Sequence, residues 1–353
     1  MKSDFERALE YLGLDASAIS TTTLSMLSSP SRTERAAFAG FWPTLALDAR
    51  RAIITRMYEA SEANVDLDFW DLFRHCLTDD DAQVRVMAIE GLWEDERADL
   101  VTLLLPLAQR DPAEQVRAAA ASALGRFLYL AECEEFDPRQ GTVIRNALES
   151  IVLDQSQPID VARRALESLA HVDDERIRGL IDWAYEHGDE RLRASAIFAM
   201  GRSADAAWAD TVLEELQSDT PAVRYEAALA SGEIQIQRAV EPLIALTTTG
   251  DADIRLAAIW SLGQIGGQRA RHALERLADS ADESTALAAE EAIAELEFCR
   301  SSMDLLVAEF NDETSGAERW VDDDESIDED EETVDDDDSL ADWDDEPLDL
   351  DSE

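Results

Sequence analysis

Hydrophobic and polar positions repeat with a fixed period between residues 189 and 280. Three segments spaced 31 residues apart share an aliphatic residue followed by Arg, with Ala four positions after the aliphatic and Gly nine after it: Leu192–Gly201, Val223–Gly232 and Ile254–Gly263. On a helix, the aliphatic residue and the residues four and eight positions later share one face, so each segment predicts an amphipathic helix. A period of this length is typical of stacked repeats.

Each segment is predicted to be the first helix of a helical hairpin. An aspartate precedes each one and is expected to cap it, namely Asp189, Asp219 or Asp251. The glycine is expected to end the helix in a left-handed conformation. Second helices are predicted at 208–217, 239–246 and 270–278. A single hairpin cannot bury its apolar face alone, so neighbouring hairpins must stack.

The segment from Asp251 to Gly263 reads Asp-x-x-Ile-Arg-x-x-Ala-x-x-x-Leu-Gly. It resembles the HEAT repeat family, in the short form found in phycobilin lyases and bacterial scaffold proteins. The resemblance implies an all-α fold, an α-solenoid of HEAT-like helical hairpins. It does not specify a function, because HEAT repeats serve many unrelated roles.

The same pattern organises most of the chain. Weaker copies begin at Val84, Val116 and Val161, with additional residues around 130–141 that predict a longer helix end and an acidic loop. We therefore expect an N-terminal helix and link in residues 1–30 and a solenoid of about seven to eight helical pairs in residues 31–310. The terminal pairs are expected to be atypical caps, the C-terminal one formed by 286–299 and extended by 303–310.

The formal net charge is −49, and residues 311–353 hold 15 Asp and 8 Glu against one Arg. A segment so charged and so poor in apolar residues predicts a disordered acidic tail. The acidic balance argues against direct binding to nucleic acid. It also fits a salt-adapted organism, which would explain the body but not the tail. Apolar runs are too short for a membrane span, and three scattered cysteines favour the cytoplasm.

The sequence contains no pattern specific for catalysis. Its four histidines lack metal-ligand spacing, and no P-loop, dinucleotide or nucleophile-elbow motif occurs. His75 and Cys76 are adjacent on a predicted helix and so do not face each other. We expect no catalytic residues, no metal and no cofactor.

The arginine in the second position of the pattern has two interpretations. Stacking would bring each guanidinium near the capping aspartate of a neighbouring repeat and form a structural Arg–Asp ladder. An anion-binding site is the other interpretation, which the overall negative field opposes. The residues concerned are Arg85, Arg117, Arg193, Arg224 and Arg255.

A second set of positions points away from the predicted core. The residue six after the aliphatic becomes large and apolar in the last three copies, and the neighbouring position two after the aliphatic does so in the last two. This predicts a protein-binding ridge, unless the stack buries these side chains as core. The ridge residues are Phe198, Tyr225, Leu229, Leu256 and Trp260.

Apolar residues also occur within the acidic tail, at Trp320, Trp343 and Leu348 among others. Such alternation resembles disordered segments that dock on basic partner surfaces, although the tail could equally serve only to solubilise the protein. The leading hypothesis is a non-enzymatic scaffold that binds a partner protein with a basic surface through its solenoid and tail. The alternative is a subunit of a phycobilin lyase or a related factor for bilin attachment, as the resemblance implies.

Overall fold

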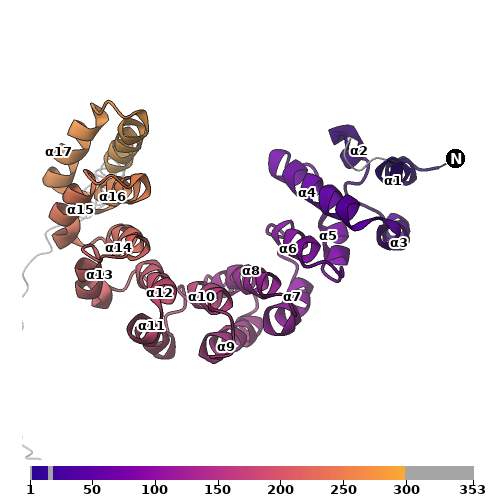
Figure 1. Cartoon of the computed structure of the whole chain (residues 1–353), viewed down its shortest axis with the longest axis horizontal. Helices are drawn as coiled ribbons and strands as arrows, with labels where there is room; N and C mark the ends of the chain where they lie inside the picture. Colours follow the sequence, from indigo (N-terminus) through magenta and orange to yellow (C-terminus); the bar gives the residue numbers. More distant parts are fainter. Residues whose placement is uncertain (1, 15–18, 299–353) are drawn as a thin grey trace, which may run out of the picture. The chain divides into compact units, whose positions relative to one another are not determined.

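The computed structural model describes residues 2–14 and 19–298. The described residues fold into helices joined by loops, and successive helices alternate between two rows (Figure 1). The odd-numbered helices are α1 (Asp4–Leu14), α3 (Arg32–Phe41), α5 (Trp70–Cys76), α7 (Asp99–Arg110), α9 (Pro138–Leu153), α11 (Glu175–His187), α13 (Ala209–Glu215), α15 (Val240–Leu246) and α17 (Gly267–Ala278). The even-numbered helices are α2 (Thr21–Ser25), α4 (Leu47–Ala63), α6 (Ala82–Glu90), α8 (Glu114–Glu132), α10 (Ile159–Ser168), α12 (Glu190–Arg202), α14 (Pro221–Glu233) and α16 (Ala252–Ile265). Residues 283–298 are also helical.

Successive even-numbered helices pack on one another from α2 to α16, and each odd-numbered helix from α5 to α15 packs on the even-numbered helix that follows it. Short 3₁₀ turns, Trp42–Thr44, Ala206–Trp208 and Gln237–Ala239, lead from one row to the other or into the next helix. The arrangement confirms the predicted all-α solenoid of helical hairpins.

The repeated pattern explains why these helices stack. In α16, Ile254 and Ala258 are fully buried, and the corresponding residues of the other copies are buried in the same way. Nearly all buried apolar residues of the described chain form one connected cluster from Phe5 to Ala292. Because each hairpin contributes only part of this core, its stability depends on its neighbours.

The predicted role of the signature glycines is wrong. The helices continue past Gly201, Gly232 and Gly263, and the residues with positive φ lie three positions later, at Ala204, Gln235 and Gly266. The glycines instead mark close approaches between even-numbered helices. A Cβ on Gly232 would lie 2.9 Å from Ser261 Cα on the next helix, so a larger residue would force the two helices apart.

The capping prediction holds at two of its three positions. Asp189 accepts hydrogen bonds from the main-chain N–H groups of Arg191 and Leu192, and Asp251 accepts from two N–H groups in the same way. The prediction is wrong for Asp219, because α14 begins at Pro221 and its N-cap residue is Thr220, whose side chain makes no capping hydrogen bond. Proline needs less capping at this position because it has no N–H group to satisfy.

The ends of the repeat array differ in part from expectation. Residues 21–25, expected to be part of a link, form α2, which Ser20 caps and whose Leu24 is buried. The additional residues around 130–141 extend α8 to Glu132 and form the loop before α9, as predicted. The predicted extension at 303–310 and the acidic tail lie outside the described residues.

Candidate functional site

The residues of the predicted ridge lie on α12, α14 and α16, and the solvent-facing side of the even-numbered helices is called here the even-helix face. Trp260 on α16 is 40% exposed. The other ridge residues are half-buried, and two of them, Tyr225 and Leu229, pack partly against the core. The face therefore presents one exposed tryptophan in line with partly exposed apolar side chains.

A shallow groove of about 200 Å³ lies beside Trp260. It runs between α16 and the helix of residues 283–298, and its lining residues are Trp260, Gln264, Ala288, Glu291, Ala292 and Glu295. The floor is made of alanine and the rim carries glutamates. Such a groove accepts an apolar side chain next to a positive charge.

The arginine of each repeat makes structural contacts. Four of the five predicted ladder arginines donate to a main-chain carbonyl six residues earlier in the chain, as Arg85 does to Asp79 O at 2.7 Å. Arg85 also pairs with both carboxylate oxygens of Asp111 at 2.7 and 2.8 Å. Each of these four guanidiniums thereby holds the loop that precedes its own helix.

The acceptor in the next repeat varies along the row. Arg255 lies 3.2 Å from Asp282, which caps the following helix, whereas Arg117 reaches Gln157 and Arg193 pairs with Glu215. Arg224 contacts the carbonyl of Ser218. An aspartate of the next repeat is thus the partner at two of the five positions.

Two further aromatic residues on the even-helix face have no counterpart in the predicted ridge. Trp93, just after α6, is 50% exposed and Tyr129, near the end of α8, is 47% exposed. The guanidinium carbon of Arg126 lies 5.8 Å from the centre of the Trp93 ring. Trp93 stands nine positions after Val84, where the three clear copies have glycine, and this departure from the pattern was the available sequence signal.

A group of partly buried glutamates lies between α10 and α14. Burial raises the pKa of Glu226 to about 7, and the neighbouring Glu167 and Glu233 add to the shift while Arg163 and Arg202 oppose it. Burial also raises the pKa of Glu233, which pairs with Arg202 at 3.2 Å. Glu226 is therefore a carboxylate whose negative charge is under-compensated in the folded protein.

A family model for HEAT repeats matches residues 71–138 and 209–294. The chain carries HEAT repeats. No curated protein sequence matches it. Its HEAT repeats are similar in fold to human deoxyhypusine hydroxylase in complex with glycerol, with 17% identity, 83% of this chain and 97% of that chain covered, and a TM-score of 0.33.

Two other solved structures are also similar to this chain. The complex of CpcE and CpcF of phycocyanin lyase from a Nostoc species is 16% identical over 76% of this chain and 97% of that chain, with a TM-score of 0.47. Importin beta is 15% identical over 83% of this chain and 46% of that chain, with a TM-score of 0.46.

The HEAT repeats bring few reactive groups together. Within residues 2–14 and 19–298, no group of three or more His, Cys, Asp or Glu side chains is placed to hold a metal ion. Cys76 is buried, and burial raises the pKa of its thiol, whereas Cys133 is exposed. No helix among the described residues is long and apolar enough to cross a membrane.

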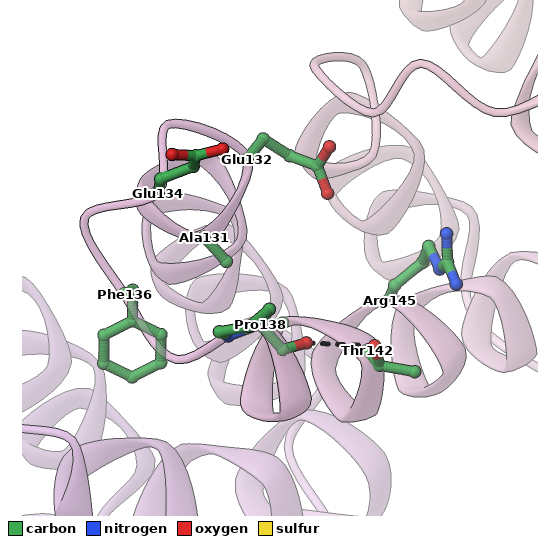
Figure 2. Close-up of a pocket in the computed structure, with 8 residues that line it drawn as sticks. Ala131, Glu132, Glu134, Phe136, Pro138, Thr142 and Arg145 are labelled. Atoms are coloured by element: carbon green, nitrogen blue, oxygen red, sulfur yellow. Dashed lines mark hydrogen bonds between the residues drawn. The ribbon is translucent and has the colours of Figure 1, made fainter.

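The insertion between α8 and α9 forms a cavity of about 540 Å³ (Figure 2). Its lining residues are Ala131, Glu132, Glu134, Phe136, Pro138, Gly141, Thr142 and Arg145. Arg145 is committed to the HEAT-repeat framework, since it pairs with Asp174 at 3.1 Å. The cavity therefore combines free carboxylates at its rim with a guanidinium that is already engaged.

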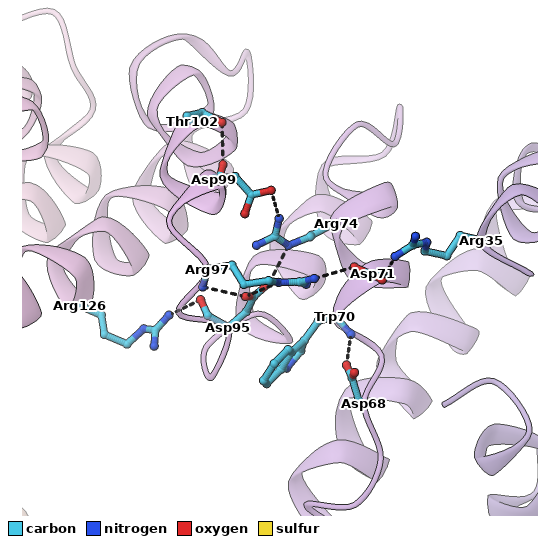
Figure 3. Close-up of polar contacts among 10 residues, drawn as sticks. All are labelled: Arg35, Asp68, Trp70, Asp71, Arg74, Asp95, Arg97, Asp99, Thr102 and Arg126. Atoms are coloured by element: carbon cyan, nitrogen blue, oxygen red, sulfur yellow. Dashed lines mark hydrogen bonds and ion pairs between the residues drawn. The ribbon is translucent and has the colours of Figure 1, made fainter. Parts of the chain in front are cut away.

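Charged residues between α3 and α8 form a connected network (Figure 3). Its centre is Asp95, which is fully buried and accepts hydrogen bonds from Arg74 and Arg97. Arg97 also reaches Asp71, which pairs with Arg35 on α3. The network joins the aromatic-rich N-terminal helices to the first HEAT repeats, which indicates a structural role.

The under-compensated charge of Glu226 predicts a measurable pH dependence. The folded state binds its proton more tightly than the unfolded chain does, so stability falls as pH rises from about 4.5 to about 7. Glu226→Gln is expected to increase the free energy of unfolding by up to about 3 kcal/mol above that range and to leave it nearly unchanged below. Urea denaturation across this pH range measures the effect.

The matched control for this experiment is Glu186→Gln on α11, whose side chain is 66% exposed. It is expected to leave the pH profile of unfolding unchanged, because an exposed carboxylate keeps its solvation in both states. Parallel pH profiles for Glu226→Gln and the unaltered protein would contradict the prediction.

Proposed function

We propose that this HEAT-repeat protein is a non-enzymatic cytoplasmic scaffold that binds a partner protein through its even-helix face. The observation that carries the proposal is the exposure of Trp260 on α16. Leu229 and Phe198 occupy the equivalent position on the two preceding even-numbered helices, α14 and α12. An exposed apolar side chain next to partly exposed ones is a feature of interaction surfaces. Tryptophan in particular contributes strongly to binding at the centre of protein interfaces.

The charges on this face favour a partner with a basic surface. Glu291 lines the groove beside Trp260, and Glu226 and Glu233 lie near the half-buried part of the ridge. Burial raises the pKa of both Glu226 and Glu233, so a partner's lysine or arginine placed there would stabilise their charged forms. The strongly negative chain also attracts a basic partner over longer distances.

Trp260→Ala tests the proposal. In affinity capture from the native cell, the variant is expected to recover at least roughly tenfold less of the partner, as loss of a central tryptophan typically costs 2 kcal/mol or more. Leu153→Ala is the control, because Leu153 is 60% exposed but lies at the end of α9 in the odd-numbered row. Equal capture by the Trp260 variant and the unaltered protein would overturn the proposal.

The acidic tail adds a second arm to the same capture. Trp320, Trp343 and Leu348 lie outside the described residues, and their docking on a basic partner remains a prediction. Deleting residues 311–353 is expected to reduce capture if the tail docks, and to leave it unchanged if the tail only solubilises. Recovery of a phycobiliprotein subunit would instead favour the alternative of a bilin lyase subunit.

A further inference from the structure

Two adjoining grooves indent the even-helix face between α6 and α12. Their volumes are about 370 and 300 Å³, and both are lined by Trp93, Ser122 and Arg164. The second also contains Arg126 and is called here the Arg126 groove; its other lining residues are Gly125, Tyr129, Glu167, Ser168, His171 and Phe198. This volume lies at the lower end of the range for small-molecule sites, which begins at about 300 Å³.

The Arg126 groove contains a cation that the protein compensates only weakly. The Arg126 side chain is 13% exposed, and its guanidinium lies 4.7 Å from the centre of the Phe127 ring and 5.8 Å from that of Trp93. Its Nη2 donates to the main-chain oxygen of Asp95 at 2.8 Å, as Figure 3 shows. Its Nη1 lies 3.5 Å from the carboxylate of Glu96, which is 65% exposed.

Nearby carboxylates supply only part of the countercharge of Arg126. The Asp95 carboxylate accepts hydrogen bonds from Arg74 and Arg97. Burial accordingly lowers the pKa of Arg126, and the acidic residues Glu96, Glu94 and Asp95 only partly oppose it. An anion brought to this guanidinium would relieve the cost of its burial.

The one glutamate that lines the Arg126 groove is already engaged. Glu167 accepts hydrogen bonds from Ser195 Oγ at 2.6 Å and from Arg164 at 2.5 Å, and it lies 3.7 Å from Arg163. Its negative charge is therefore balanced within the protein. The distant acidic residues act weakly here, since charges more than about 8 Å apart in solvent are largely screened at physiological salt.

The walls of the Arg126 groove are aromatic. Trp93 and Tyr129 are about half exposed, and the Tyr129 ring meets the ring of His171 edge-on with centres 4.9 Å apart. Burial, together with the nearby Arg202, lowers the pKa of His171, so its imidazole is neutral at neutral pH. A flat apolar body could stack here next to the guanidinium.

We propose that the Arg126 groove binds a small ligand that carries a carboxylate on an aromatic or aliphatic body. The carboxylate would pair with the planar guanidinium of Arg126, a geometry that arginine matches better than lysine does. The apolar body would lie between Trp93 and Tyr129. The groove shares Phe198 with the predicted ridge but does not contain Trp260, and the proposed ligand site does not depend on the scaffold function proposed above.

Isothermal titration of the full chain with 3-phenylpropionate, 3-phenylpropionamide and 3-phenylpropylamine tests the proposal. The three probes share one apolar body and differ in charge. Saturable binding is expected for the carboxylate, with affinity at least roughly tenfold above that of the amide and the amine, because a charge-assisted hydrogen bond is worth this much or more. Affinity is expected to fall as salt concentration rises.

Variants then assign the site. Arg126→Gln and Trp93→Ala are each expected to weaken carboxylate binding at least roughly fivefold. Arg238→Gln should leave it unchanged, because that arginine is 68% exposed and pairs with Asp210 elsewhere. Trp93→Ala keeps the proposal testable if Arg126→Gln fails to fold, since Trp93 is half exposed and its replacement disturbs packing less. Equal affinity for carboxylate and amide, or the absence of saturable binding, would overturn the proposal.

Discussion

Replacing Arg85 with methionine is expected to lower the free energy of unfolding by about 3–5 kcal/mol, the usual cost of removing one partner from a buried ion pair. Arg85 is only 7% exposed and so is Asp111, its bidentate partner in the next repeat. Methionine fills a similar volume but cannot pair with the carboxylate. Asp111 would then remain buried without its cation, and the carbonyls of Asp79 and Asp80 would lose their donor.

Arg51→Met is the matched control. Arg51 on α4 makes the same bidentate contact with Asp81, the cap of α6, but its side chain is 39% exposed. The control is expected to cost much less than Arg85→Met, because solvent replaces a lost partner at the surface. Urea denaturation followed by circular dichroism measures both variants.

A second variant separates the lost pairing from altered packing. Combining Arg85→Met with Asp111→Asn removes the charge left behind, so the pair is expected to recover part of the lost stability relative to Arg85→Met alone. A double variant that is less stable than the single one by the full cost of both changes, or similar costs for Arg85 and Arg51, would contradict the assigned role of this ion pair.

The fold could be predicted from sequence because it rests on local periodicity. The aliphatic residue and the alanine four positions later recur in every clear copy, and these are the residues that become the buried seam. Gly232 shows the limit of this reasoning. Its spacing fits a helix end, but the reason for glycine is the approach of Ser261 from another helix, which no local pattern contains.

The arginine positions show the same contrast between what a local sequence pattern predicts and what depends on a neighbouring repeat. That these side chains would serve the stack follows from their regular recurrence, but the partner of each depends on what the next repeat places opposite. Arg255 meets Asp282, whereas Arg193 meets Glu215 together with the Tyr185 hydroxyl at 3.0 Å. Even in copies with the same 31-residue spacing, the arginine is kept while its partner changes.

The features of the even-helix face that sequence did not indicate arise from contacts between repeats. Arg126 has no special spacing, yet Trp93 from the preceding repeat and Phe127 beside it place its guanidinium between rings. Likewise, Glu226 is one of many acidic residues in the sequence. Its raised pKa comes from burial and from the neighbouring charge of Glu167 on α10, two helices earlier in the even-numbered row. Only a folded stack makes either residue distinctive.

The charge network of the N-terminal repeats leads to the other large expected effect. Asp95 has no exposed surface and lies in the loop between α6 and α7. It accepts from Arg74 Nε at 2.7 Å and from Arg97 Nε and Nη2, each at 2.9 Å. Burial alone would raise its pKa, but the hydrogen bonds from both arginines lower it overall. The ion pairs therefore contribute stability that is lost as pH falls through this lowered pKa.

Asp95→Ala is expected to reduce the free energy of unfolding by about 3–5 kcal/mol, because two arginines would lose the carboxylate between them. Asp99→Ala is the control: Asp99 also accepts from Arg74 at 2.7 Å but is 71% exposed, and its loss is expected to cost about 1 kcal/mol or less. Urea denaturation compares the two. If the two substitutions lower the free energy of unfolding equally, the network is a surface feature. A much larger loss for Asp95→Ala would identify Asp95 as the residue that holds the N-terminal helices to the HEAT repeats.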